Sequence, residues 1–154
     1  MCSAPSRVRS GSTCSMIQLS WMPLLRYLWA LPYTLMGLLF VPFVILTGGR
    51  ARVFRGVLEL DGLLPAFWLR HVVLVRGAAA ITIGHVVLGR DDRALTQTRS
   101  HERVHVRQYE RWGPAFVPAY LIAGLWAMLR REGAYRGNYF EREARGRSQP
   151  RGGA

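Results

Sequence analysis

Residues 100–112 read SHERVHVRQYERW, and the interpretation of the whole chain starts from this stretch. On an α-helix, residues four apart lie one turn above each other, so His101 and His105 present their imidazoles on one face. Glu102 lies next to that face, where a carboxylate can take a proton from a metal-held water without being a ligand. The HExxH spacing therefore predicts a zinc site, with Glu102 as the general base.

The same spacing can also arise when two histidines merely pack or hydrogen-bond on an amphipathic helix. The chain is poor in the residue types concerned, with 4 His and 9 acidic residues among 154. A chance HExxH is therefore rare in such a composition. We expect the metal-binding interpretation to hold rather than the packing one.

Two glutamates downstream, Glu141 and Glu143 in YFEREA (residues 139–144), are candidates for a third ligand. Side chains two residues apart on a helix point about 200° apart, so only one of them can face a given metal. The spacing leaves both open. The 35 residues between His105 and Glu141 (106–140) suffice to end one helix, return antiparallel and begin a third.

HERVH followed by NYFEREA resembles the gluzincin zinc metallopeptidases, in which HExxH supplies two histidines and a glutamate on a downstream helix supplies the third ligand. It is most similar to small bacterial membrane-associated members, whose second motif reads approximately E-x-x-A-D. The resemblance spans residues 81–145 and implies Glu141 as the third zinc ligand and Ala144 as the small residue. Arg145 stands where that motif has an aspartate, so the surroundings of the metal depart from the family pattern.

A metallopeptidase also needs a group that stabilises the oxyanion of the transition state. Four side chains are candidates for this role or for supporting the ligands: Tyr135, Tyr139, His85 and Tyr109. Tyr109 continues the histidine face by one more turn, and packing is the simpler expectation for it. A lone histidine in a strand, such as His85, is also more often a packing residue.

Composition narrows the classes of partner and of metal ligand. The net charge is +12, and all 21 basic residues are arginine, spread from Arg7 to Arg151 without a dense run or a ladder of stacking aromatics. We therefore expect an anionic membrane surface rather than nucleic acid as the partner. Cys2 and Cys14 are the only cysteines, too few for a disulfide framework or a cysteine zinc site. Any metal must be held by histidine and carboxylate.

An uncharged run of 23 residues, 27–49, is long enough to cross a bilayer as a helix. We expect one transmembrane span, kinked at Pro32 and Pro42, with a buried helical hairpin of a soluble protein as the alternative. The flank after the run carries three arginines, Arg50, Arg52 and Arg55. By the positive-inside rule this flank places the following domain in the cytoplasm, at a bacterial inner membrane.

In order, the chain is expected to form a disordered tail (1–22), a transmembrane segment (23–49), a domain (50–145) and a second disordered tail (146–154). The domain pattern predicts an α+β fold with strands at 53–60, 68–75 and 79–89, then helices at 94–112, 114–131 and 139–145. Thr96 or Thr98 is expected to cap the first of these helices. The resemblance implies a minimal zincin-like domain: a small sheet, the HExxH helix, a return helix and a ligand helix. Its last strand would lie along the cleft, where a substrate peptide can pair with the edge.

The expected function is a membrane-anchored zinc metallopeptidase that cleaves a peptide or protein substrate. A non-catalytic membrane protein that keeps a zincin-like fold for metal binding or assembly is the main alternative. A basic membrane-surface or nucleic-acid binder without a metal is a third, and it predicts steep salt dependence and no effect of chelators.

Overall fold

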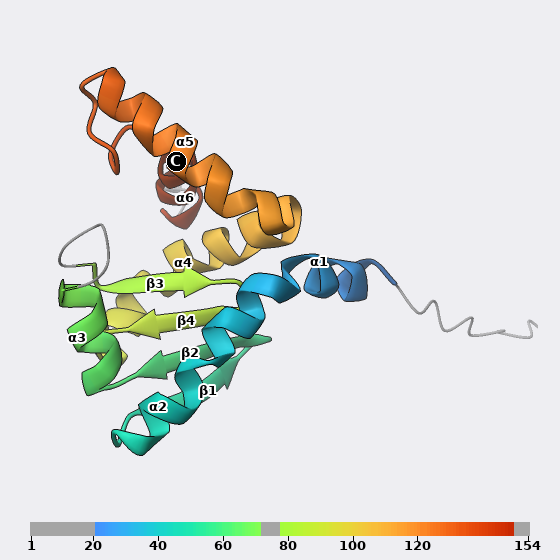
Figure 1. Ribbon diagram of the computed structural model, residues 1–154, viewed down its shortest axis with the longest axis vertical. Helices are drawn as coiled ribbons and strands as arrows, with labels where there is room; N and C mark the ends of the chain where they lie inside the picture. The colour runs from blue at the N-terminus through green and yellow to red at the C-terminus, as the bar shows by residue number, and fades with distance from the viewer. Residues whose placement is uncertain (1–20, 72–77, 150–154) are drawn as a thin grey trace, which may run out of the picture.

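The computed structural model describes residues 21–71 and 78–149, and it has an α+β architecture. A four-stranded mixed sheet lies between two layers of helices (Figure 1). The helices are α1 (Trp21–Leu38), α2 (Phe40–Leu46), α3 (Leu63–His71), α4 (Asp92–Trp112), α5 (Phe116–Leu129) and α6 (Tyr139–Ser148), with a 3-10 turn at Gly113–Ala115. Of the tails predicted at 1–22 and 146–154, residues 1–20 and 150–154 lie outside the described residues, whereas residues 21–22 belong to α1 and residues 146–148 to α6.

The sheet contains β1 (Arg50–Phe54), β2 (Val57–Asp61), β3 (Ala80–Ile83) and β4 (Val86–Gly89) in the order β1-β2-β4-β3. β1 runs antiparallel to β2, and β3 runs antiparallel to β4. β2 and β4 are parallel and form the centre of the sheet. β3 is therefore an edge strand, and α4 packs beside it.

Two of the three predicted strands are hairpins in the structure. The segment 53–60 contains a turn at Arg55 and Gly56, both with positive φ (49° and 80°), as a two-residue hairpin turn requires. The segment 79–89 turns at Gly84, which has a φ of 63°. The sequence prediction missed the first turn because arginine rarely adopts a positive φ. It missed the second because apolar residues continue on both sides of it.

The third predicted strand, 68–75, is wrong over its described part. Trp68 to His71 belong to helix α3, and residues 72–75 lie outside the described residues. Pro65 is tolerated in the first turn of this helix, where no backbone N–H is needed. The run is apolar almost throughout, and such a run carries no period that separates helix from strand.

The predicted transmembrane run forms two consecutive helices that pack on the sheet. α1 ends at Leu38 and α2 begins at Phe40, with the α2 side chain of Val44 fully buried against Leu60 and Leu88. Gly37 lies so close to the sheet that an added Cβ would be 2.6 Å from Cβ of Val86. The segment is thus part of the folded unit.

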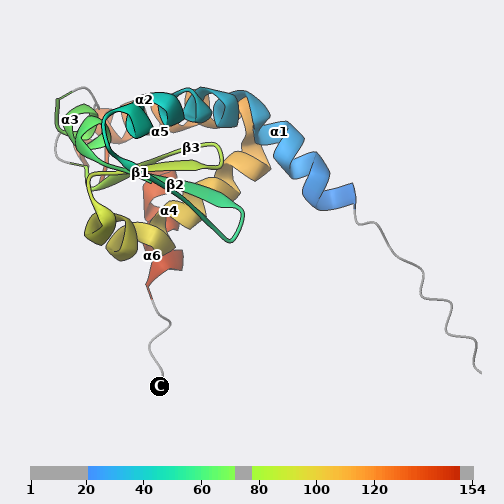
Figure 2. The same ribbon diagram turned by 90° about the horizontal axis from the view of Figure 1, so that it is seen from below.

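The outer surfaces of four helices carry many exposed large apolar side chains. These helices are α1, α2, α3 and α5, and Figure 2 shows them on one side of the molecule, with α4 and α6 on the other. Examples are Leu28, Leu46, Leu63, Ile122 and Leu129, each more than 60% exposed. Two helical stretches, Leu25–Leu46 and Asp92–Leu129, are long and apolar enough to cross a membrane by length and composition.

The helix α4 connects the sheet to the C-terminal helices. Leu95 and Val106 pack against the sheet, while Tyr109 packs against Phe116 and Phe140. Its N-cap is Asp91, which accepts a hydrogen bond from the backbone N–H of Ala94 at 2.7 Å.

The predicted caps Thr96 and Thr98 instead lie inside α4 and donate to carbonyl oxygens one turn back. At the other end of the chain, α6 continues to Ser148, three residues past the predicted end at 145.

Candidate metal centre

His101, His105 and Glu141 meet in the structure at the contact between α4 and α6. Nε2 of His101 lies 3.1 Å from Nε2 of His105. Nε2 of His101 is 3.3 Å from Oε2 of Glu141, and Nε2 of His105 is 3.3 Å from Oε1 of the same carboxylate. We call these three residues the candidate metal centre.

The spacing of these atoms fits a tetrahedral metal ion. Ligand atoms about 2.05 Å from a tetrahedral zinc lie about 3.3 Å from one another. The nitrogen–nitrogen distance of 3.1 Å is close to that edge length, and each nitrogen lies 3.3 Å from a different oxygen of the Glu141 carboxylate. One ligand atom from each of the three residues lies within 4.8 Å of the other two. Oε2 of Glu141 is also buried without a hydrogen-bond partner among the described residues. Two imidazoles and one carboxylate are a donor set that zinc prefers.

The carboxyl side of the centre is positioned by the contacts of α6. Asn138, fully buried, caps α6 by accepting from the backbone N–H of Phe140 and donates to the carbonyl of Tyr120 on α5. Gln108 on α4 donates from Nε2 to the carbonyl of Phe140 at 3.1 Å. These bonds tie three helices together and set the position of Glu141 one residue further along.

Gln108 also orients one of the imidazoles. Its Oε1 lies 2.8 Å from Nδ1 of His105, and because Nε2 of the same amide is the donor to α6, Nδ1 is the donor here. In the neutral imidazole, the proton on Nδ1 leaves the lone pair of Nε2 available for a metal ion. This is the tautomer a metal ligand needs.

Glu102 lies beside the centre and is only 6% exposed. The hydroxyl of Thr82, on edge strand β3, donates a 2.7 Å hydrogen bond to Oε2 of Glu102. Burial raises the pKa of Glu102, although His105 and Thr82 act in the opposite direction. A carboxylate with a raised pKa and a fixed rotamer suits a general base.

Opposite charges at the centre shift the pKa values of its ligands. Burial acts to lower the pKa of His105, but the Glu141 and Glu102 carboxylates outweigh it and raise this pKa. Burial acts to raise the pKa of Glu141, but the imidazoles of His101 and His105 beside the carboxylate and the hydrogen bond from Tyr120 hold it well below its ordinary range. Without a metal the centre therefore favours a carboxylate beside a protonated imidazole.

Two tyrosines lie near Glu141. The hydroxyl of Tyr120 donates a 2.8 Å hydrogen bond to Oε1 of Glu141. Burial and the neighbouring Glu141 carboxylate raise the pKa of Tyr135 to about 12, and the Arg145 guanidinium lies 5.5 Å from its ring centroid. Of the sequence-based candidates for oxyanion stabilisation, Tyr135 is the one whose pKa is raised by burial and by the Glu141 carboxylate.

The other three candidates lie elsewhere. His85 is at the α1 interface, stacked on Tyr27 with ring centroids 4.2 Å apart and hydrogen-bonded to Thr34 at 3.0 Å. Tyr109 is 5% exposed and packs its ring against Phe116. Tyr139 is 62% exposed at the start of α6. Their positions follow from packing and from the direction of each helix face, which the sequence does not specify.

Glu143, the rival third ligand, is directed away from the imidazoles. Its Oε2 accepts from Gln108 at 2.9 Å, and its Oε1 pairs with Arg147 at 2.9 Å. Arg145, at the position of the family aspartate, places Nη1 3.9 Å from Oε2 of Glu141 and donates to the carbonyl of Arg136. It therefore contributes a positive charge next to the centre.

Sequence reasoning missed three residues that support the centre: Thr82, Gln108 and Tyr120. Gln108 follows His105 by three positions and so lies near the histidine face of α4, which is a signal that was available. Tyr120 has the hydroxyl group in an otherwise apolar helix, which is a weaker indication that its side chain supports a site. Thr82 offered none, because its contact with Glu102 depends on the sheet.

Comparison with models of protein families, with curated proteins and with solved structures finds no match to this chain. What the fold and the site define is accordingly a class: an α+β protein with a small mixed sheet and a His-His-Glu group able to hold a metal ion.

Proposed function

We propose that the protein is a zinc-dependent metallopeptidase with a minimal zincin-like fold, attached to a membrane. The observation that carries this proposal is the meeting of His101, His105 and Glu141, whose candidate ligand atoms lie within 4.8 Å of one another, with Glu102 buried beside them. Bound at these residues, zinc would lower the pKa of a water and polarise the scissile carbonyl.

The residues of the chain supply the rest of the proposed reaction. Glu102, held by Thr82, takes a proton from the attacking water and then passes it to the leaving amine. Tyr135 is the side chain we assign to the oxyanion, because its neutral phenol lies beside Glu141. Tyr120 holds the ligand carboxylate in place.

The substrate we propose is an extended peptide or protein segment, with nucleic acid not expected as a partner. β3 is an edge strand next to α4, and its Thr82 reaches Glu102. A peptide added to this edge by backbone hydrogen bonds would run past the candidate metal centre.

We further propose that the apolar helices attach the protein to the bacterial inner membrane. A single span through Leu25–Leu46, with the domain in the cytoplasm, is the arrangement that the arginine flank favours. The sheet packs directly on this span, as the close approach of Gly37 to Val86 shows. Protection of an N-terminal tag, but not of a C-terminal tag, from protease added on the cytoplasmic side tests this orientation.

The deciding experiment compares wild-type protein, purified as the full chain in mild detergent, with His105→Ala and Glu102→Gln. Wild type is expected to hold stoichiometric zinc and to cleave an unstructured protein, and His105→Ala to lose both. Glu102→Gln should keep zinc and lose cleavage, whereas the exposed control Glu132→Gln should keep both. Cleavage by Glu102→Gln would refute the proposed general base.

A non-catalytic metal-binding membrane protein is the second candidate function, and Arg145 favours it. A guanidinium 3.9 Å from Oε2 of Glu141 adds positive charge beside a metal ligand. This candidate predicts that the wild-type protein binds stoichiometric zinc but does not cleave the unstructured protein. It also predicts that Arg145→Asp gains cleavage activity.

A further inference from the structure

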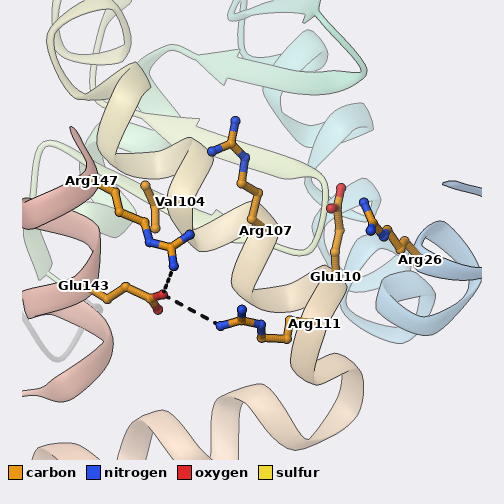
Figure 3. Close-up of a pocket in the computed structure, with 7 residues that line it drawn as sticks. All are labelled: Arg26, Val104, Arg107, Glu110, Arg111, Glu143 and Arg147. Carbon is orange, nitrogen blue, oxygen red and sulfur yellow. Dashed lines mark ion pairs between the residues drawn. The ribbon is translucent and has the colours of Figure 1, made fainter. Parts of the chain in front are cut away.

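A pocket of about 410 Å³ lies next to the candidate metal centre, on a neighbouring face of α4. Three helices, α1, α4 and α6, form it (Figure 3). Its charged lining is Arg26, Arg107, Glu110, Arg111, Glu143 and Arg147, and we call it the arginine pocket. None of these residues belongs to the candidate metal centre.

The arginine pocket carries an excess of positive charge. Four guanidinium groups face two carboxylates, which leaves a formal charge of +2. Glu143 is shared between Arg147 at 2.9 Å and Arg111 at 3.8 Å, while Glu110 is 3.4 Å from the imidazole of His85. Within residues 21–71 and 78–149, Arg26 and Arg107 form no ion pair with a carboxylate.

One wall of the pocket is held rigidly from behind. Oε2 of Glu143 accepts a 2.9 Å hydrogen bond from Gln108, the residue that also orients His105. Oε1 of Glu143 is left to hold Arg111 and Arg147. Two of the four guanidinium groups, those of Arg111 and Arg147, are thereby held near Glu143 before any ligand arrives, which reduces the entropy lost on binding.

We propose that the arginine pocket binds a phosphate group, as a soluble phosphate ester or as a phospholipid headgroup. The dianion of a phosphate monoester neutralises the charge of +2 and the monoanion of a diester headgroup neutralises half of it, and the planar fork of arginine matches phosphate oxygens two at a time. The volume also admits the substituent that the phosphate carries. Arg26 lies on α1, one of the apolar helices, so both sources can reach the pocket.

The first test titrates inorganic phosphate into the full chain in neutral detergent at constant ionic strength, by calorimetry. Wild type is expected to bind it saturably, and Arg107→Gln and Arg26→Gln to bind at least about tenfold more weakly. Arg142→Gln, an exposed arginine of α6 outside the pocket, removes the same charge and should bind as wild type does. Metal-free and zinc-loaded protein should both bind phosphate, because none of the charged residues of the pocket is a proposed zinc ligand.

The second test separates the two sources with vesicles of phosphatidylcholine, with and without phosphatidylglycerol. A headgroup ligand predicts stronger partitioning on phosphatidylglycerol for wild type and Arg142→Gln but not for Arg107→Gln. A soluble ligand predicts that wild type, Arg142→Gln and Arg107→Gln partition equally onto the vesicles. In that case the wild type still binds inorganic phosphate saturably in the first test. The proposal is overturned if neither readout depends on Arg107, if Arg142→Gln is equally weakened, or if phosphate binding requires zinc.

Discussion

The hydroxyl of Thr82 donates a 2.7 Å hydrogen bond to Oε2 of Glu102, across the contact between the edge strand β3 and α4. Thr82→Val keeps the shape of the side chain and removes the donor. We expect cleavage to fall about 10- to 100-fold with zinc content unchanged. Thr82→Ser keeps the hydroxyl and should retain most of the activity. A fall in zinc content with Thr82→Val would show that the contact is structural instead.

Tyr120 supports the ligand Glu141 through its phenol, so Tyr120→Phe should weaken zinc binding. We expect an affinity about 10- to 100-fold lower by competition with a chelator, because the carboxylate loses the donor that orients it. Tyr139→Phe removes an exposed hydroxyl and is the matched control. Equal zinc affinity in both variants would exclude an orienting role for Tyr120.

Removal of the metal should create a defined pH dependence of stability. The depressed pKa of Glu141 adds stability above its ordinary value of 4.5, which is lost as the pH falls. The raised pKa of His105 adds stability below its ordinary value of 6.5, which is lost as the pH rises through the folded-state value. The melting temperature of the chelator-treated protein should therefore be highest between these two values.

The control for this pH dependence is Glu141→Gln, which should flatten the maximum. Above pH 6.5 the melting temperature of the metal-free protein should fall, whereas its affinity for zinc should rise, because a ligand imidazole must be neutral. A chelator-treated wild type whose melting temperature rises steadily from acid to alkaline pH would contradict the ion pair.

Arg99 forms a two-pronged ion pair with Glu59, with both nitrogen–oxygen distances at 2.8 Å, and Glu59 is buried in β2. Arg99→Ala leaves that carboxylate buried without its partner. We expect the free energy of unfolding to fall by about 2 kcal/mol. Arg93→Ala, an exposed arginine earlier on α4, should change it by less than about 0.5 kcal/mol. Denaturant titration of the two variants measures the difference.

The close approach of Gly37 to the sheet makes α1 part of the folded unit. Gly37→Val forces a side chain against Val86 and the carbonyl of Ile83, and it should destabilise the protein by about 1–3 kcal/mol. Met36→Val changes an exposed neighbour on the same helix and should have little effect. Unchanged melting of Gly37→Val in detergent would mean that α1 leaves the sheet.

Local periodicity accounts for the part of the site that was predictable from the sequence. His101 and His105 come together because a helix repeats every 3.6 residues, a property that needs no other part of the chain. The helices α4, α5 and α6 were likewise predictable from their apolar pattern and their Gly-Pro boundary. The resemblance then pointed to Glu141, one of two glutamates that the spacing alone could not distinguish.

Contacts between segments far apart in the chain decided everything else. The packing of α6 on α4 turned Glu141 toward the imidazoles and Glu143 toward Gln108. Thr82, on the edge strand β3, contacts Glu102, whereas His85 contacts Thr34 of α1 and lies outside the candidate metal centre. The hairpins and α3 also depended on tertiary packing, because a continuous apolar run satisfies a strand or a buried helix equally well. A pattern along the chain specifies which face a residue lies on, but only packing specifies what that face meets.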